Sequence, residues 1–405
     1  MCISFNLIND FANIACQSYD FYYGHGLIIV NLRGIIKVGL SEELNKENIH
    51  DDNFSAIRWK SKFGSVTFNQ FGRELPTCGI NENGLVITSM WHDRKNKGTS
   101  IQSENGISEL QWIQYQLDCY ASTEEVIQNI NKIQVNSQIY PLHYMVTDKQ
   151  KNAAIIEMDF DNSVKVYRTE FCACSNAGYF DSIEYVKKKD SSLKATEIII
   201  KEGSLDRFWI AYLAVKEFRA FLEKNRKIDY AFNILDNVSQ NVGTTSIFNW
   251  IAKGVPPSQT FWQIAFDIVD MQIFFRTKQS STIKIINVLD FNYSSNSPCK
   301  VLDVNTTLSG SVNNVFSTYR REDNRRIVRK SFRPVKHLFN TSEQEKLIVY
   351  PEILTKSMHS NKNLQIEKMA QKHQNAFGIP NRCKAIALAA LLIGIVSIFL
   401  FKKDK

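Results

Sequence analysis

Polar and apolar residues alternate at the beginning of the chain. Over residues 2–7, polar side chains at even positions alternate with apolar side chains at odd positions. A period of two is typical of a strand with one apolar face, and it places Cys2 on the polar face at the start of that strand. Asn9-Asp10 indicates a turn. The next run, residues 14–21, therefore predicts a returning strand that brings Asp20 back near residue 2.

Short strand-like runs separated by turn signals follow in the first half of the chain. Further strands are predicted at residues 27–30, 65–68, 78–87, 143–146, 154–157, 164–167 and 172–176. Asn83-Gly84 divides the third of these into two runs, because this dipeptide favours the tight turn of a hairpin. A turn at residues 148–152 joins the next two runs into a second hairpin. Residues 38–58 are polar and are predicted to form a loop.

Helical periodicity appears in three places. Helices are predicted at residues 108–121, at 123–133 with Thr123 as N-cap, and at 205–223 with Ser204 as N-cap. Strands return at residues 261–268, 271–276 and 282–287. Strands, then helices, then strands again favour a layered α+β architecture over a repeat of parallel strand–helix units.

The charge of the chain is concentrated in one segment. The 405 residues carry a net charge of +8, and 44% of them are hydrophobic, so one large core or two domains are expected. The segment from Arg320 to Lys336 contains eight Lys or Arg residues and only two acidic residues, Glu322 and Asp323. Basicity confined to one segment does not indicate a nucleic-acid-binding domain, and no nucleic-acid partner is predicted.

The cysteines indicate neither a disulfide framework nor a metal site. Eight of them are scattered along a chain that is too long to need disulfides for stability. Cys172-x-Cys174 has no second Cys or His pair at zinc spacing, so these two are interpreted as strand cysteines. The beginning of the chain lacks the basic and apolar pattern of a signal peptide. These features fit folding in a reducing cytosol.

An apolar run near the end of the chain predicts a membrane anchor. Ala385 to Phe401 is an unbroken apolar run of 17 residues with basic residues on both sides. As a helix it would extend about 25 Å, slightly less than the ~30 Å hydrocarbon core. A buried core helix is the alternative, but lysines at both ends and the lack of a polar face argue against it. The prediction is a single-pass tail anchor with residues 1–383 on the cytosolic side.

The predicted organisation therefore has three parts. Residues 1–310 form the globular domain, residues 311–383 a basic linker with partial helix, and residues 384–405 the tail anchor. The basic run from Arg320 to Lys336 has two equal interpretations. It is a solvated face, or it binds anionic headgroups beside the anchor, at about 1 kcal/mol per basic residue.

Cys2 is the first candidate for chemistry. Removal of Met1 would leave Cys2 at the N-terminus, with a thiol and a free α-amine on the same residue. An α-amine titrates near pH ~7.7–8.0, so much of it is available as a base at neutral pH. A nucleophile with its own proton acceptor is the arrangement of N-terminal nucleophile hydrolases. A cysteine at position 2 by chance is the simpler alternative.

Further residues strengthen the first interpretation. They are Ser18–Phe21, Arg33-Gly34, Trp59–Val66, Gly79–Leu85, His143–Asp148, Ser175-Asn176 and Asp206–Phe208. With Cys2, and in this order and spacing, they resemble the choloylglycine hydrolase and penicillin V acylase family of N-terminal nucleophile hydrolases, which cleave linear amide C–N bonds. The resemblance covers roughly residues 1–305. Trp59–Lys62 and Met90-Trp91 are more similar to the penicillin V acylase-like branch.

The resemblance implies a fold and a set of roles. The fold would be a four-layer αββα sandwich with two central antiparallel sheets. Cys2 is similar to the family's nucleophile, and Asp20 occupies the position of the aspartate that holds the N-terminal amine and thiol. Asn176 matches the asparagine of the oxyanion hole, and Trp91 falls where a backbone N–H supplies the second donor. Arg207 matches an arginine near the site. The substrate would be a small acyl amide, lipophilic if the membrane prediction holds, with no metal or organic cofactor.

The chain departs from the family pattern at Gln17, where the family usually has an arginine. A guanidinium would lower the pKa of the thiol, whereas Gln forms hydrogen bonds without adding charge. The sequence therefore predicts a less activated Cys2, a changed substrate or lost activity. In the last case the protein is a membrane-anchored binding or scaffolding module.

Acyl transfer to an amine is a third alternative. Without the family, Asp20 is better interpreted as a turn residue, whereas a turn and a site role are equally favoured for Asn176. His92 is expected at the surface beside a packed Trp91.

Overall fold

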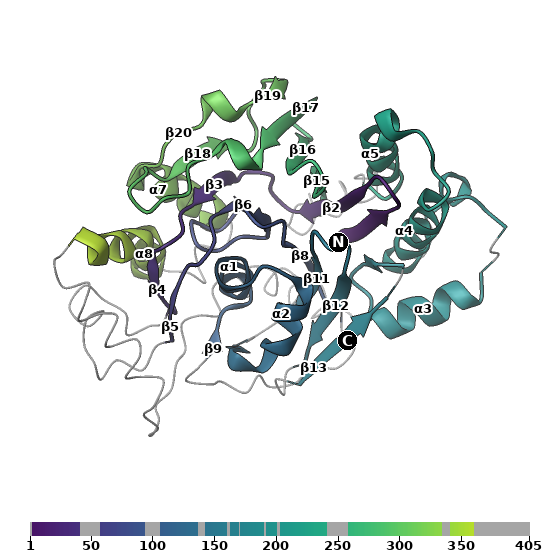
Figure 1. Ribbon diagram of the computed structural model, residues 1–405, viewed down its shortest axis with the longest axis horizontal. Helices are drawn as coiled ribbons and strands as arrows, with labels where there is room; N and C mark the ends of the chain where they lie inside the picture. The colour runs from purple at the N-terminus through teal and green to yellow at the C-terminus, as the bar shows by residue number, and fades with distance from the viewer. Residues whose placement is uncertain are drawn as a thin grey trace, which may run out of the picture.

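A computed structural model describes the chain in ten segments (Figure 1). They are residues 2–40, 57–93, 106–136, 142–159, 163–169, 171–189, 192–200, 203–240, 258–333 and 341–359. Two β-sheets with helices on their outer faces make up this part of the protein. The expected α+β class is thereby confirmed.

The first strand lies inside the first sheet, which we call sheet A. Across the described residues its strand order is β14-β1-β2-β15-β16-β17-β19, and only β17 and β19 run parallel. The bounds are β1 Ile3–Ile8, β2 Asn13–Phe21, β14 Ala173–Cys174, β15 Gln259–Asp267, β16 Gln272–Thr277, β17 Ser280–Asn287 and β19 Gly310–Ser311. Ser4 pairs with Gln17, which confirms the predicted N-terminal hairpin.

The second sheet, sheet B, contains both of the other predicted hairpins. In the described chain its order is β13-β12-β11-β8-β7-β6-β3-β18-β20. The bounds are β3 Leu27–Asn31, β6 Ser65–Asn69, β7 Cys78–Asn81, β8 Val86–Trp91, β11 Leu142–Thr147, β12 Ala153–Met158, β13 Val164–Arg168, β18 Lys300–Asp303 and β20 Ser317–Thr318. Gly84 has a φ of 86° in the turn between β7 and β8, a conformation that glycine adopts without strain. Two short ribbons pair β4 (Ile36–Val38) with β5 (Arg58–Lys60) and β9 (Gly106–Ile107) with β10 (Gln134–Val135).

The polar face of β1 packs against sheet B and not against solvent. Asn6 Nδ2 donates to Thr147 Oγ1 of β11 at 2.8 Å, and Ser4 Oγ lies 2.9 Å from the sulfur of Met90 in β8. Nearby, the ring of Phe68 contacts Trp262, Phe266 and Phe275 of sheet A. Alternation along β1 thus separates two buried faces, one facing the other sheet and one facing helices.

Helices cover the outer faces of both sheets. α4 (Ser204–Phe218) and α5 (Lys227–Asn237) lie on sheet A, while α1 (Glu109–Cys119) and α2 (Thr123–Gln128) lie on sheet B. The hydroxyl of Tyr144 in β11 donates to the Glu109 carbonyl at 3.0 Å, which fixes α1 to its sheet. Figure 1 shows the succession from α4 and α5 through β1 and β2, then β8 and β11, to α1. This is the αββα layering that the resemblance implied.

Two of the three predicted helices end earlier than expected. The helix predicted over residues 123–133 is α2 followed by a 3₁₀ turn at Ile130–Lys132, and its N-cap is Ser122, whose hydroxyl accepts from the Glu125 N–H. α4 begins at Ser204, one residue earlier than expected and with Gly203 rather than Ser204 as its N-cap, and it ends at Phe218, where Asn9 Nδ2 donates to the carbonyls of Phe218 and Phe221. A distant side chain therefore caps this helix end. The sequence pattern missed α3 (Tyr179–Lys187) and α5.

Two helices extend the globular body beyond residue 310. α7 (Arg321–Phe332) and α8 (Thr341–His359) lie in the segment that was predicted as a linker with partial helix. Their residues Val328, Phe332 and Ile348 are fully buried in the core. Within the described residues, α7 and α8 pack against the globular body, because these apolar side chains are buried in it.

The structure describes no candidate for the membrane anchor. Among the described residues, every helix is too short or too polar to cross a bilayer. The apolar run at 385–401 lies outside the described residues, as does the rest of the predicted linker from residue 360 onward.

A buried asparagine on α7 tests whether α7 and α8 belong to the cooperative unit. Asn324 Oδ1 accepts from the Arg73 N–H at 2.8 Å, and its Nδ2 donates to the carbonyls of Leu347 and Ile348. We expect Asn324→Ala to lower the free energy of unfolding in urea by about 1–3 kcal/mol, since it leaves these buried groups unsatisfied. Arg326→Ala, which removes only half-exposed contacts on the same helix, should change it by less than about 1 kcal/mol. Equal effects of the two variants would contradict the extended domain.

Candidate active site

Cys2 lies at the start of β1 and is almost fully buried, with 7% of its surface exposed. Its sulfur contacts the backbone of Asp20 on β2. The Asp20 N–H points to it at 3.4 Å, and the thiol donates to the Asp20 carbonyl at 3.5 Å. Burial raises the pKa of the Cys2 thiol, the Asp20 carboxylate adds to the rise, and Arg207 opposes it. At neutral pH the thiol is therefore protonated and needs a base to become a nucleophile.

The Asp20 carboxylate lies on the helix-facing side of sheet A. Its Oδ2 accepts from Arg207 Nη2 at 2.6 Å, and its Oδ1 accepts from Thr260 Oγ1 at 2.5 Å and from Ser18 Oγ at 3.0 Å. Asp20 therefore connects β2 to β15 and to the first turn of α4. The carboxylate is buried and held by three hydrogen-bonding groups. The Cys2 sulfur contacts the backbone of Asp20 and not this side chain.

Arg207 is one of the largest fully buried side chains in the described protein. Besides its ion pair with Asp20, its Nε donates to the Val238 carbonyl at 2.7 Å and its Nη2 to Ser18 Oγ at 3.2 Å. A cation in the first turn of a helix is unfavourable for the helix dipole. The buried carboxylate across the interface compensates this cost, so the sequence position of Arg207 is explained by Asp20.

Gln17 lies on the face of β2 that points toward sheet B, as its pairing with Ser4 requires. Its Nε2 donates to the Ser89 carbonyl of β8 at 2.8 Å, and the side chain is fully buried. By strand alternation Cys2 shares this face. Gln17 therefore occupies the inter-sheet layer near the thiol with hydrogen-bonding capacity and no charge.

Asn176 and Trp91 contact each other where the two sheets meet. Asn176 Nδ2 donates to the Trp91 carbonyl at the end of β8, at 2.6 Å. The backbone N–H groups of Asn176 and Ala177 both donate to Ser204 Oγ at 2.9 Å. An amide nitrogen carries two N–H groups, so one remains for another acceptor.

The register of β1 relates Cys2 to Asn176. β14 pairs with β1 so that Ser4 lies opposite Cys174, and the Asn6 N–H donates to the Cys172 carbonyl in the same register. β14 ends at Cys174, and Asn176 leaves the ladder, because its N–H donates to Ser204 Oγ and its carbonyl accepts from the Asp93 N–H. The segment that carries Asn176 therefore begins at the same end of β1 as Cys2. The fold thus brings Cys2, Asp20 and Asn176 to one end of three neighbouring strands.

Comparison with known proteins agrees with this geometry. Residues 16–192 match the family described as linear amide C–N hydrolases, choloylglycine hydrolase family. Over this segment the chain is similar to the choloylglycine hydrolase family. A penicillin V acylase from Pectobacterium atrosepticum is 22% identical over 267 residues, which cover 59% of this chain and 69% of that protein. The predicted resemblance to this family and to its penicillin V acylase-like branch is confirmed.

Two solved structures have a similar fold. The penicillin V acylase from Agrobacterium tumefaciens superposes with a TM-score of 0.65 at 20% identity, covering 79% of this chain and 98% of its own. The C2A mutant of the conjugated bile acid hydrolase from Clostridium perfringens has a TM-score of 0.58 at 15% identity, covering 77% and 99%. Sheets A and B therefore form an N-terminal nucleophile hydrolase fold.

Three hydroxyl groups around the candidate site have functions that sequence reasoning missed. Thr260 and Ser18 hold the Asp20 carboxylate, and Ser204, expected only as a helix cap, instead binds the backbone after β14. Thr260 is 240 residues from Asp20 in the chain, and only the pairing of β15 with β2 brings them together. No local sequence signal identifies such a contact.

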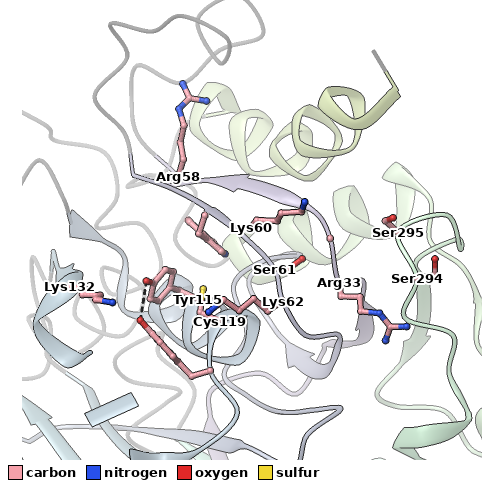
Figure 2. A pocket seen from close by; sticks show the side chains of 13 residues that line it. Arg33, Arg58, Lys60, Ser61, Lys62, Tyr115, Cys119, Lys132, Ser294 and Ser295 are labelled. Atoms are coloured by element: carbon pink, nitrogen blue, oxygen red, sulfur yellow. Dashed lines mark hydrogen bonds between the residues drawn. The ribbon is translucent and has the colours of Figure 1, made fainter. Parts of the chain in front are cut away.

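A large cavity lies elsewhere on the molecule. It has a volume of about 830 Å³ and is lined by residues of β5 and the end of α1, among others (Figure 2). Five of its lining residues are basic, namely Arg33, Arg58, Lys60, Lys62 and Lys132. None of the six predicted site residues lines it. A rim of cations is also unsuited to an apolar acyl chain, so this cavity is not the candidate active site.

The buried ion pair beside the candidate site gives a stability prediction. We expect Arg207→Met to lower the free energy of unfolding by about 3–5 kcal/mol, because it leaves the buried Asp20 carboxylate without this cation. Lys216→Met, at an exposed position of the same helix, should change it by no more than about 0.5 kcal/mol. Both are measured by urea denaturation at neutral pH. A loss below about 1 kcal/mol for Arg207→Met would show that the pair is not a structural connection between α4 and β2.

Proposed function

We propose that this protein is a cysteine amidase that hydrolyses small acyl amides, with Cys2 as its nucleophile after removal of Met1. The observation that supports the proposal is the pairing of β1, which puts the Cys2 sulfur against the backbone of Asp20 on β2 and brings the segment after β14, with Asn176, to the same end of sheet A. Similarity to a family of linear amide hydrolases supports the reaction class.

The proposed reaction begins with proton transfer within Cys2. The free α-amine takes the thiol proton, and the thiolate attacks the amide carbonyl to form a C–S bond and a tetrahedral oxyanion. The side-chain amide of Asn176 and the backbone N–H of Trp91 donate to this oxyanion, and loss of one such donor typically costs ~10²–10³ in rate. The α-ammonium then protonates the leaving nitrogen, and the C–N bond breaks to release the amine and a thioester.

Water completes the cycle. The α-amine takes a proton from the water as it attacks the thioester, and collapse of the second oxyanion breaks the C–S bond. The carboxylic acid leaves and the Cys2 thiol is regenerated. Arg207 and Thr260 hold the Asp20 carboxylate, and this fixes the part of β2 whose backbone contacts the Cys2 sulfur. The reaction needs no cofactor.

Gln17 is proposed to make this nucleophile less activated than in relatives with a cation at that position. Burial already raises the pKa of the Cys2 thiol, and the neutral Gln17 amide does nothing to reverse it. The same observation favours a second candidate function. A protein with this fold but an inert thiol would be a binding or scaffolding module.

The apolar run at residues 385–401 motivates a membrane tether for the enzyme. A tether with the domain on the cytosolic side would give it access to lipophilic acyl amides. On α7, Arg321, Arg325 and Arg329 all pair with Glu345 of α8, and the single charge of that carboxylate offsets only one of the three. The rest of this positive charge remains to attract anionic headgroups.

Replacement of the nucleophile tests the proposed enzyme. Intact mass of the purified full-length protein should show Met1 removed, and Cys2 should be labelled by a thiol-directed acylating probe. Cys2→Ala should lower hydrolysis across a panel of acyl amides by about 10³-fold or more. Cys299→Ala, at a partly buried cysteine far along the chain, serves as the control and should leave the rate unchanged. Retained Met1, or hydrolysis that survives Cys2→Ala, would sink the proposal.

Substitution of Gln17 tests its proposed effect on the thiol. We expect Gln17→Arg to lower the pKa of the Cys2 thiol by about one unit or more, since a nearby cation stabilises the thiolate. The rate of alkylation of Cys2 should then reach half its maximum at a lower pH. Gln17→Met, similar in size and uncharged, is the matched control and should not lower that pH. Identical profiles for both variants would show that residue 17 does not set the reactivity of Cys2.

A further inference from the structure

Two histidines and a glutamate gather in the layer between the sheets. His143 on β11 pairs directly with Glu157 on β12, and His92 follows the last residue of β8. All three are buried, with exposed fractions of 0% for His143, 4% for Glu157 and 6% for His92. His92 is therefore not the surface residue expected from the sequence. His143 also pairs with Met90, so it faces sheet A in the inter-sheet layer.

The three side chains have the spacing of metal ligands. One potential ligand atom from each lies within 4.8 Å of those of the other two. The two imidazole rings are 3.7 Å apart between centroids, and His143 Nδ1 is 3.0 Å from Glu157 Oε1. Zinc bonds of about 2.0–2.1 Å in a tetrahedron require ligand atoms about 3.4 Å apart.

The surroundings of His143 also suit a cation. Its ring is completely buried, and neither ring nitrogen has an aligned hydrogen-bond partner among the described residues, although Nδ1 lies 3.0 Å from Glu157 Oε1. A buried carboxylate needs a counter-charge. A divalent cation bound by an imidazole nitrogen and a Glu157 oxygen would supply that charge.

We infer that His92, His143 and Glu157 form a binding site for a divalent first-row transition metal, with zinc as the best match. Two imidazoles and a carboxylate are a known zinc ligand set, and they leave a fourth position for water. Glu157 Oε1 also accepts from the Tyr179 N–H at 2.6 Å, which orients the carboxylate. The ion would join β8, β11 and β12 to the start of α3.

The location gives the site a structural role. His92 directly follows Trp91, whose carbonyl accepts from the Asn176 amide. A metal on His92 would therefore fix the end of β8 that holds Asn176. Binding depends on neither the Cys2 thiol nor the proposed reaction, so the inference stands or falls separately from the proposed amidase.

Cobalt binding to the full-length protein tests this inference. Protein stripped of metal with a chelator is titrated with Co²⁺, and the visible absorption and bound cobalt are measured. We expect one Co²⁺ per chain with the spectrum of a tetrahedral or five-coordinate ion, displaced by Zn²⁺. Glu157→Gln, which keeps the size of the side chain, and His143→Gln should each weaken binding by at least about tenfold. His25→Gln, at a histidine outside the cluster, should bind as the wild type does.

A second measurement covers variants that do not fold. In the wild-type protein, chelation should lower the melting temperature and added Zn²⁺ should restore it. The inference is overturned if the stripped protein binds no Co²⁺ and its melting temperature ignores Zn²⁺. It is also overturned if Glu157→Gln and His143→Gln bind as tightly as wild type, or if a cobalt–thiolate absorption disappears in Cys2→Ala, because the metal would then be on the thiol.

Discussion

The position of Cys2 depends on the hydrogen-bonded pairing of β1 along both of its edges. β2 pairs with one edge and β14 with the other, in antiparallel registers that the Ser4–Gln17 and Ser4–Cys174 pairs define. A slip of one residue would turn every side chain of β1 to the opposite face of the sheet, moving its polar residues out of the inter-sheet layer. Backbone hydrogen bonds, more than any side chain, therefore determine where the thiol lies.

The two neighbours of β1 bring different chemistry to its beginning. β2 brings Asp20, whose carboxylate is held on the helix side by Arg207 and Thr260. The segment after β14 brings Asn176, a neutral amide tied to the Trp91 carbonyl. A buried ion pair makes a rigid connection between elements, and neutral preorganised donors suit a developing negative charge. The charged Asp20–Arg207 pair and the neutral Asn176 amide therefore come from opposite neighbours of β1.

The inter-sheet layer contains several buried polar side chains, and they restrict how the sheets pack. Ser4, Asn6 and Gln17 contact Met90, Thr147 and Ser89 of sheet B, and the His143–Glu157 pair lies in the same layer. Buried polar groups need partners, so a different packing of the sheets would leave several of them unsatisfied. The candidate nucleophile and the proposed metal ligands occupy this one layer. Both therefore depend on how the two sheets are aligned.

The sequence by itself determined the features that depend on neighbouring residues: the N-terminal hairpin, the Asn83-Gly84 turn, the start of α4, and the motifs that identify the choloylglycine hydrolase family. Alternation showed that β1 has two faces, but not that the polar one is covered by sheet B. Only the tertiary structure placed Thr260 on Asp20, buried His92 beside His143, and packed α7 and α8 onto the domain. These contacts join residues far apart in the chain, and local periodicity carries no information about which distant strand or helix will cover a given face.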